Sequence, residues 1–212
     1  RYLRNDIGIP GTSGFIPAGL AGFDSTGSIG YGYDPDRARK LLEEAGYPGG
    51  EGLPEVVLST TAEYVDLCKF IQHELELLGI RLRIDVTPAA ALKEMKAQAK
   101  LPFFRGSWIA DYPDAENYLS LFLTHNFTPG GPNYCRYSNP EVDQLYAEAM
   151  REVSDTARAG LYHRMDSLIM ADAPVVVLYY DEVLRFYRKG IEGLGSNPIN
   201  LLKLKQVSKV KG

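Results

Sequence analysis

The chain has 212 residues, of which 45% are hydrophobic and 24% are charged, and its formal net charge at pH 7 is −4. This composition is typical of a globular protein that is long enough to bury a core as one large domain or two small ones. The mild acidity argues against nucleic acid as a partner, because nucleic-acid-binding domains usually carry a basic patch.

Helices and strands are predicted to alternate from residue 34 onward. Residues 1–33 are rich in Gly, Pro and Ser and predict an extended, loop-like segment. Asp34 followed by Pro35 is a typical helix start, and Gly46 is the natural end of that helix. The pattern then predicts a strand over 55–60, a helix over 64–78 that Gly79 ends, and an alternating strand over 80–86.

The second half of the chain continues this alternation. The apolar run PVVVLYY, residues 174–180, predicts a strand that is buried on both faces. Asn139-Pro140 predicts a helix start, and Asp155 can cap a long helix after it. The other predicted elements are a helix over 90–100, a strand over 103–109, a helix over 115–123 and a loop-like tail from 189. Such alternation predicts an α/β fold built of layers.

Two cysteines, Cys68 and Cys135, match no metal-binding spacing. Cys68 lies on the apolar face of the predicted helix over 64–78, which predicts a buried free thiol. No run of residues reaches transmembrane length.

Motifs for catalysis are missing from the sequence. Ser13 lies in GTSGF, which does not fit the GxSxG pattern of a nucleophilic serine. Asp111, Asp114 and Glu116 do not follow the spacing of a calcium-binding loop. The Gly-rich segment contains neither GxGxxG nor a Walker pattern. We therefore expect no enzymatic activity, no metal and no cofactor.

The stretch GSWIADYPDAENYL, residues 106–119, raises the question of what Asp111 does. This acid ends an apolar segment and lies between the aromatic residues Trp108 and Tyr112. Capping of the following helix is the ordinary role of such an acid, and Asp114 is the better candidate for it.

The same stretch, with Arg105 in front of it, resembles the signature of the extracytoplasmic solute-binding proteins of the oligopeptide and dipeptide type, which feed ABC importers. Six further segments resemble successive landmarks of that family: GFIPAGLAGFD, YDPDRARKLLEEAGYPGGEGLP, IQHELELLGIRLRI, GGPNYCRYSNPEVDQLYAEA, the predicted helix over 158–173 and APVVVLYY. The resemblance covers nearly the whole chain in the family's order. It implies an α/β fold, specifically the second lobe of a two-lobed periplasmic-binding-protein-like fold of type II, with a mixed sheet flanked by helices.

The resemblance also implies how the chain is organised and where it acts. Residues 1–178 would form the second ligand-binding lobe, and residues 179–212 would form a crossover and a tail that returns to the first lobe. The first lobe, the signal segment and any lipid anchor would lie outside this chain. The implied partners are a short peptide and the permease subunits of an ABC transporter, in a periplasmic or extracytoplasmic location. Membrane association would depend only on an anchor or permease outside the chain.

A ligand-binding site follows from the same resemblance. In peptide-binding members, the acid of the W-x-x-D pattern binds the α-ammonium group of the ligand, and Trp108 and Asp111 match that pattern. Trp108 and Tyr112 would form apolar walls. Arg105 matches an arginine that in some relatives holds the carboxylate end of the ligand, which a guanidinium can bind through two hydrogen bonds.

Several alternatives stay open at this point. Asn133 and Tyr134 follow a Gly-rich turn, and they either face the cleft or only shape the loop. Trp108 could be a core residue, and Arg105 could pair with a structural acid. Relatives of this fold also bind nickel complexes, haem, oligosaccharides or opines. A glycoside or peptide hydrolase and a transcriptional sensor are rivals from other classes.

Overall fold

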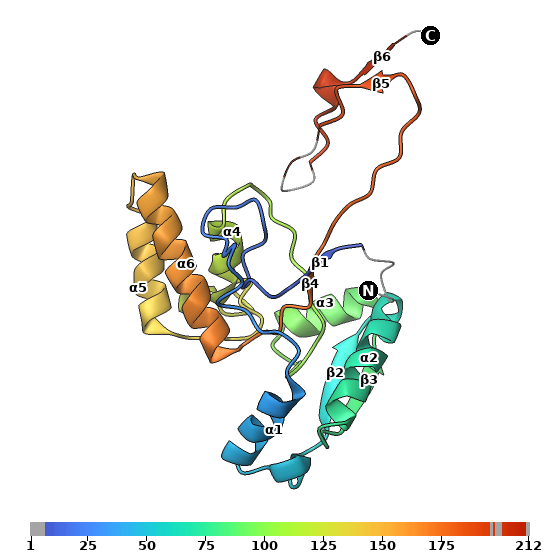
Figure 1. Ribbon diagram of the computed structural model, residues 1–212, viewed down its shortest axis with the longest axis vertical. Coiled ribbons are helices and arrows are strands. Elements are labelled where there is room, and N and C mark those ends of the chain that lie inside the picture. The colour runs from blue at the N-terminus through green and yellow to red at the C-terminus, as the bar shows by residue number, and fades with distance from the viewer. Residues whose placement is uncertain (1–6, 196, 198–200, 211–212) are drawn as a thin grey trace. The chain divides into compact units, whose positions relative to one another are not determined.

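The structure is a computed structural model that describes residues 7–195, 197 and 201–210 (Figure 1). The chain divides into two compact units, and each is described here by itself. The first unit comprises Gly32–Ser107 and Phe122–Ser138. Among the described residues, the second unit comprises 7–31, Trp108–Leu121, 139–195, 197 and 201–210.

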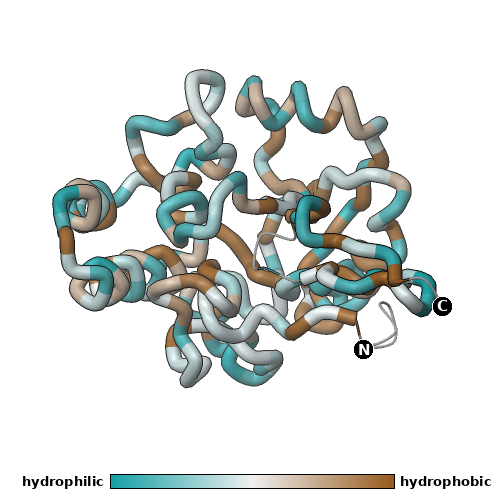
Figure 2. Tube along the Cα trace, turned by 90° about the horizontal axis from the view of Figure 1, so that it is seen from above, coloured by the Kyte–Doolittle hydropathy of each residue, from teal (hydrophilic) through white to brown (hydrophobic). Residues whose placement is uncertain are grey.

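The first unit contains the longer strands. In chain order its elements are α1 (Pro35–Glu44), η2 (Pro48–Gly50), β2 (Val56–Thr60), η3 (Ala62–Tyr64), α2 (Val65–Glu76), β3 (Leu82–Val86), α3 (Ala89–Ala97) and η5 (Thr124–Asn126). Apolar and polar residues are interspersed along the chain (Figure 2).

The two longest helices of the second unit are α5 and α6, and most of its other residues lie in irregular segments. Its elements are β1 (Ile9–Pro10), α4 (Glu116–Leu119), η4 (Ser120–Phe122, whose last residue belongs to the first unit), α5 (Pro140–Ala149), α6 (Asp155–Asp172), β4 (Tyr179–Tyr180), β5 (Ile191–Glu192), η6 (Leu204–Gln206) and β6 (Ser208–Lys209). Within the described ranges, none of the helices has the length and apolar character that crossing a bilayer requires.

The core of the first unit lies between a parallel strand pair and α2. β2 and β3 run parallel, with Val56 opposite Leu82 at one end and Thr60 opposite Val86 at the other. Cys68 of α2 is fully buried and is a free thiol, as the sequence predicts. The apolar cluster around it consists of Val56, Leu58, Ile71, Leu75, Leu82 and Ile84.

The chain returns to β2 after α3. Phe104 forms a parallel bridge with Ser59, and the Arg105 amide donates to the Ser59 carbonyl at 2.9 Å. Three segments of the first unit therefore run in the same direction. Because the carboxyl ends of parallel segments lie at one edge, the residues that follow them are brought together there.

The second unit is built on the packing of α5 against α6, which lie side by side (Figure 1). Their buried residues include Val142, Leu145, Ala149, Tyr162, Met165, Ile169 and Met170. β1 and β4 form a short antiparallel pair, with Ile9 opposite Tyr180.

One carboxylate of α6 holds the N-terminal loop of the second unit. Asp166 is fully buried, and its oxygens accept hydrogen bonds from the amides of Phe15 (2.8 Å) and Ile16 (3.1 Å). The Tyr180 hydroxyl donates to the carbonyl of Gly14 at 2.6 Å. These bonds satisfy backbone groups that have no regular strand partner, which a buried loop requires.

The α/β fold class is confirmed, and the helix ends follow their local signals. Asp34 accepts from the Arg37 amide at 2.9 Å, and Asn139 accepts from the Glu141 amide at 3.0 Å. Gly46 and Gly79, the predicted helix ends, have φ values of +84° and +82°. Such positive φ values favour glycine because it has no Cβ.

Two predicted strands form only in small part, and the prediction that 174–180 is buried on both faces is wrong. The segment 103–109 makes only the single bridge at Phe104, and in 174–180 only Tyr179–Tyr180 pairs, while Val176 is 76% exposed. Apolar β-branched runs favour extended backbone, but a strand forms only where a partner segment supplies hydrogen bonds. Ser154, and not Asp155, caps α6, because its hydroxyl accepts from the Ala157 amide. The division into 1–178 and 179–212 stays a prediction.

We predict that the free energy of unfolding of the chain increases as the pH falls from 7 to 4, relative to an Asp166→Asn variant. Burial raises the native pKa of Asp166 to about 6, although its two amide hydrogen bonds oppose the shift, and the ordinary value is 3.8. The folded state therefore binds this proton more tightly than the unfolded state, so protonation favours folding. The relative gain should be on the order of 3 kcal/mol.

Urea unfolding of both proteins across this pH range measures the effect. The gain should develop as the pH falls through about 6 and be complete below about 4. Identical pH dependence in the two proteins would contradict the assignment.

Candidate functional site

The stretch from Trp108 to Asn117 is organised by one side-chain oxygen. Oδ1 of Asn117 accepts a hydrogen bond from the Trp108 indole Nε1 at 2.8 Å and another from the Asp111 amide at 3.3 Å. Asn117 lies in α4 and is only 5% exposed. The buried oxygen is poorly accessible to water, which favours keeping both of its donors in place. Trp108 and Asp111 are thereby held in one arrangement.

The carboxylate of Asp111 is exposed and unpaired. Within the part of the chain that the structure describes, no side chain or amide donates to it and no cation lies within ion-pair distance. The N-cap position of α4 is Ala115, and Asp114 just before it accepts at Oδ1 from the amide of Glu116, the first residue of α4, at 2.9 Å. The capping alternative for Asp111 therefore gains no support, and this carboxylate is available to a cation from elsewhere.

Tyr112 lines a hollow in the second unit that Trp108 and Asp111 do not line. Its hydroxyl donates to Glu116, which also accepts from the Tyr146 hydroxyl. The bond to Glu116, together with burial, raises the pKa of the Tyr112 hydroxyl. The hollow has a volume of about 300 Å³ and is also lined by Asp114, Met150, Arg158 and Tyr162.

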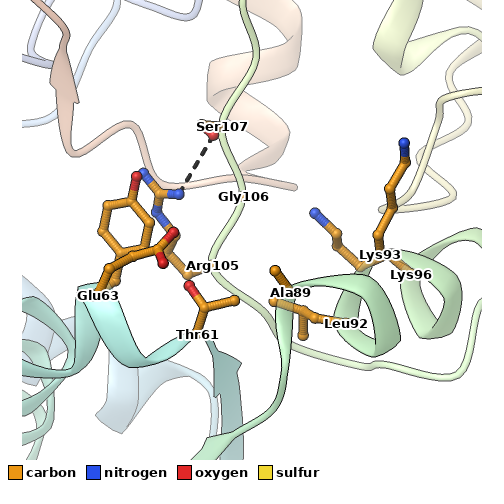
Figure 3. Close-up of a pocket in the computed structure, with 10 residues that line it drawn as sticks. Thr61, Glu63, Ala89, Leu92, Lys93, Lys96, Arg105, Gly106 and Ser107 are labelled. Atoms are coloured by element: carbon orange, nitrogen blue, oxygen red, sulfur yellow. Dashed lines mark hydrogen bonds between the residues drawn. The ribbon is translucent and has the colours of Figure 1, made fainter.

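Arg105 lies at the carboxyl-terminal edge of the parallel segments of the first unit. Its guanidinium carbon is 3.3 Å from the centre of the Tyr64 ring, and Nη1 donates to the Ser107 hydroxyl at 3.4 Å. Such stacking holds a guanidinium flat against the aromatic ring. Arg105 lines a pocket of about 140 Å³ (Figure 3). The rest of the pocket comes from residues after β2 (Thr61, Glu63, Tyr64), from α3 (Ala89, Leu92, Lys93, Lys96) and from Gly106 and Ser107.

Asn133 and Tyr134 have different environments in the first unit. Asn133 is fully buried, and its Nδ2 donates to the carbonyls of Leu123 and Tyr137, both at 2.9 Å. Its Oδ1 accepts from the Tyr137 amide at 3.2 Å. These bonds agree with the loop-shaping alternative for Asn133. Tyr134 is half-buried, and the ammonium of Lys96 lies 5.5 Å from the centre of its ring.

The structure thus places the six predicted residues in separate local groups. Asn117 joins Trp108 and Asp111 in the second unit, whereas Lys96 lies near Tyr134 and lines the pocket of Arg105 in the first. Sequence reasoning missed both Asn117 and Lys96. A single buried amide has no periodic signal, and a lysine on a helix ordinarily indicates a solvated face. That the six residues predicted from the sequence contact a ligand stays a prediction.

Comparison with known proteins gives the family. Residues 2–129 match the family described as "Bacterial extracellular solute-binding proteins, family 5 Middle". The chain is 28% identical over 192 residues to the glutathione-binding protein GsiB of Shigella flexneri serotype 5b, which covers 88% of this chain and 37% of GsiB. The chain therefore spans about a third of the length of the curated relatives that it matches.

Solved structures give the fold. The periplasmic binding protein DppA from Helicobacter pylori, in complex with the peptide STSA, matches with a TM-score of 0.80 at 23% identity, over 97% of this chain and 40% of DppA. OppA of Burkholderia pseudomallei matches with a TM-score of 0.76 at 25% identity, over 96% of this chain and 41% of OppA.

The fold is therefore that of the type II periplasmic binding proteins, as the resemblance implies. The chain belongs to the bacterial extracellular solute-binding proteins of family 5.

We predict that Asn117→Leu loosens the Trp108–Asp111 segment. Two partly buried hydrogen bonds are lost, so the free energy of unfolding should fall by about 1–3 kcal/mol. Trp108 is the sole tryptophan of the sequence, so its fluorescence reports on this segment alone. Quenching by acrylamide should increase in the variant.

Asn139→Ala provides the matched control, because it removes the capping side chain of α5 and does not touch Trp108. It should lower stability by about 1 kcal/mol without changing the quenching. Equal quenching in Asn117→Leu and the wild-type chain would show that Asn117 does not hold the indole.

Proposed function

We propose that this chain is one lobe of a solute receptor that binds short peptides between two lobes and delivers them to the permease of an ABC importer. The observation that carries the proposal is the unpaired carboxylate of Asp111 beside Trp108, in the arrangement set by Asn117. The protein that contains this lobe and a second one is called the two-lobed protein below. The group that it would recognise is one that all unblocked peptides share.

Every unblocked peptide has an α-ammonium group, whatever its side chains. One carboxylate in a fixed position can therefore recognise peptides as a class. Asp111 is exposed in this chain, so its ion pair with an ammonium would be weak in open solvent. Closure of a second lobe over the ligand would exclude water and strengthen the pair. The ring of Trp108 would supply an apolar wall that tolerates different ligand side chains.

The relatives support this ligand class. DppA is described in complex with a tetrapeptide, and GsiB is described as a glutathione-binding protein. Glutathione is itself a tripeptide with a free α-ammonium group, so both descriptions agree with recognition by a carboxylate. The same comparisons support a binding role without catalysis, because these relatives are solute-binding proteins.

The location and the other partners follow from the family. DppA is described as an ABC-transporter-associated periplasmic protein, and we infer the same side of the cytoplasmic membrane for the two-lobed protein. Its partners would be the peptide and the permease subunits, with a lipid anchor as one route of attachment. Nucleic acid has no role in this proposal.

We predict that Asp111→Asn in the two-lobed protein weakens the binding of unblocked tripeptides by about 3–5 kcal/mol, more than a hundredfold in Kd. The reason is that the variant leaves the buried α-ammonium without its counter-charge. Isothermal titration calorimetry with Ala-Ala-Ala measures the loss.

An N-acetylated peptide is the matched control for this experiment. It should bind the wild-type protein weakly, and Asp111→Asn should cause it little additional loss, because both changes remove the same ion pair. Fully additive losses would contradict the pairing of Asp111 with the ammonium group.

A further inference from the structure

The pocket that contains Arg105 has more positive charge than one ligand carboxylate requires. Lys93 and Lys96 of α3 line it together with Arg105, and Glu63 is the one acid among its lining residues. Their side chains project from α3 in the same general direction as the Arg105 side chain (Figure 3). Three cations thus share a pocket of about 140 Å³ with a single carboxylate.

Lys96 is the unusual member of this group. It is half-buried, and its ammonium lies 5.6 Å from the ring centre of Phe104 and 5.5 Å from that of Tyr134. Among the described residues, no carboxylate lies within 4.0 Å of Lys96 or of Lys93. Burial lowers the pKa of Lys96, and the charges of Arg105 and Lys93 lower it further. A partly buried ammonium is usually paired, and Lys96 lacks such a carboxylate partner, whereas Lys93 is exposed.

We propose that Lys93 and Lys96 bind a second negative group of the ligand, in addition to the terminal carboxylate for which Arg105 is the candidate. The inference rests on the proposed function and narrows its ligand class to short peptides that carry an acidic side chain or a second free carboxylate. The pocket is smaller than the roughly 300 Å³ or more of a site that encloses a whole small molecule. It suits one charged group of a larger ligand.

The types of residue agree with this division of roles. Arg105 is held flat by Tyr64, which suits a planar carboxylate in a defined orientation. Lysines carry a point charge on a flexible stem, so they follow an acidic group whose position varies among peptides. The aromatic rings beside Lys96 stabilise its charge before the ligand arrives.

The test uses the two-lobed protein and pairs of alanine tripeptides with Glu or Gln at the first, second or third position. Glu and Gln have nearly the same shape, so their affinity ratio isolates the charge. For at least one position, the wild-type protein should prefer Glu by about tenfold or more. Replacing both Lys93→Gln and Lys96→Gln should bring that ratio close to unity while the Gln peptide retains its affinity.

Lys100→Gln is the matched control, because Lys100 is exposed, lies three residues after the end of α3 and does not line the pocket. It should preserve the Glu preference. A ratio near unity at all three positions in the wild-type protein, with normal binding of the Gln peptides, would overturn this inference and leave the proposed function intact. Failure of every tripeptide to bind would overturn the proposed function and this inference with it.

Discussion

The hydrogen bonds to Oδ1 of Asn117 are the interaction on which the candidate site depends. This single oxygen accepts from the Trp108 indole and from the Asp111 amide, and it does so from a position that is almost closed to solvent. The segment between them has no regular secondary structure that could hold it. Without the amide, an exposed acid and a large ring would sample many arrangements, and ordering them would cost ligand-binding energy. Asn117 therefore holds Trp108 and Asp111 in the arrangement on which the proposed site rests.

A second constraint comes from strand direction in the first unit. β2, β3 and the bridge at Phe104 are parallel, so the residues after each segment collect at one edge. Arg105, Tyr64 and Lys96 come from three different parts of the chain and line one pocket for this reason. The two units thus offer opposite charges, a free carboxylate at Asp111 in one and a cationic pocket in the other.

Much of the fold was predictable because its signals are local. Asp34-Pro35 and Asn139-Pro140 mark helix starts through their own side chains, and Gly46 and Gly79 mark helix ends through their backbone. The strands predicted over 103–109 and 174–180 form only in small part, because strand formation depends on distant partner segments that composition does not reveal.

Residues of the candidate site could likewise be predicted from local sequence motifs but not from contacts between distant parts of the chain. Trp108 and Asp111 could be named from a short motif that resembles a known family. Asn117 and Lys96 could not, because their importance arises from burial and from neighbours such as the Tyr134 ring, which lies far away in sequence.

The central claim is that this fold binds peptides, and native mass spectrometry of the two-lobed protein, purified gently from its host, tests it most directly. The account predicts a series of bound masses that fit short peptides. A single discrete mass that fits no peptide, or the isotope pattern of a metal complex, would contradict it and would mean that Asp111 serves a different ligand.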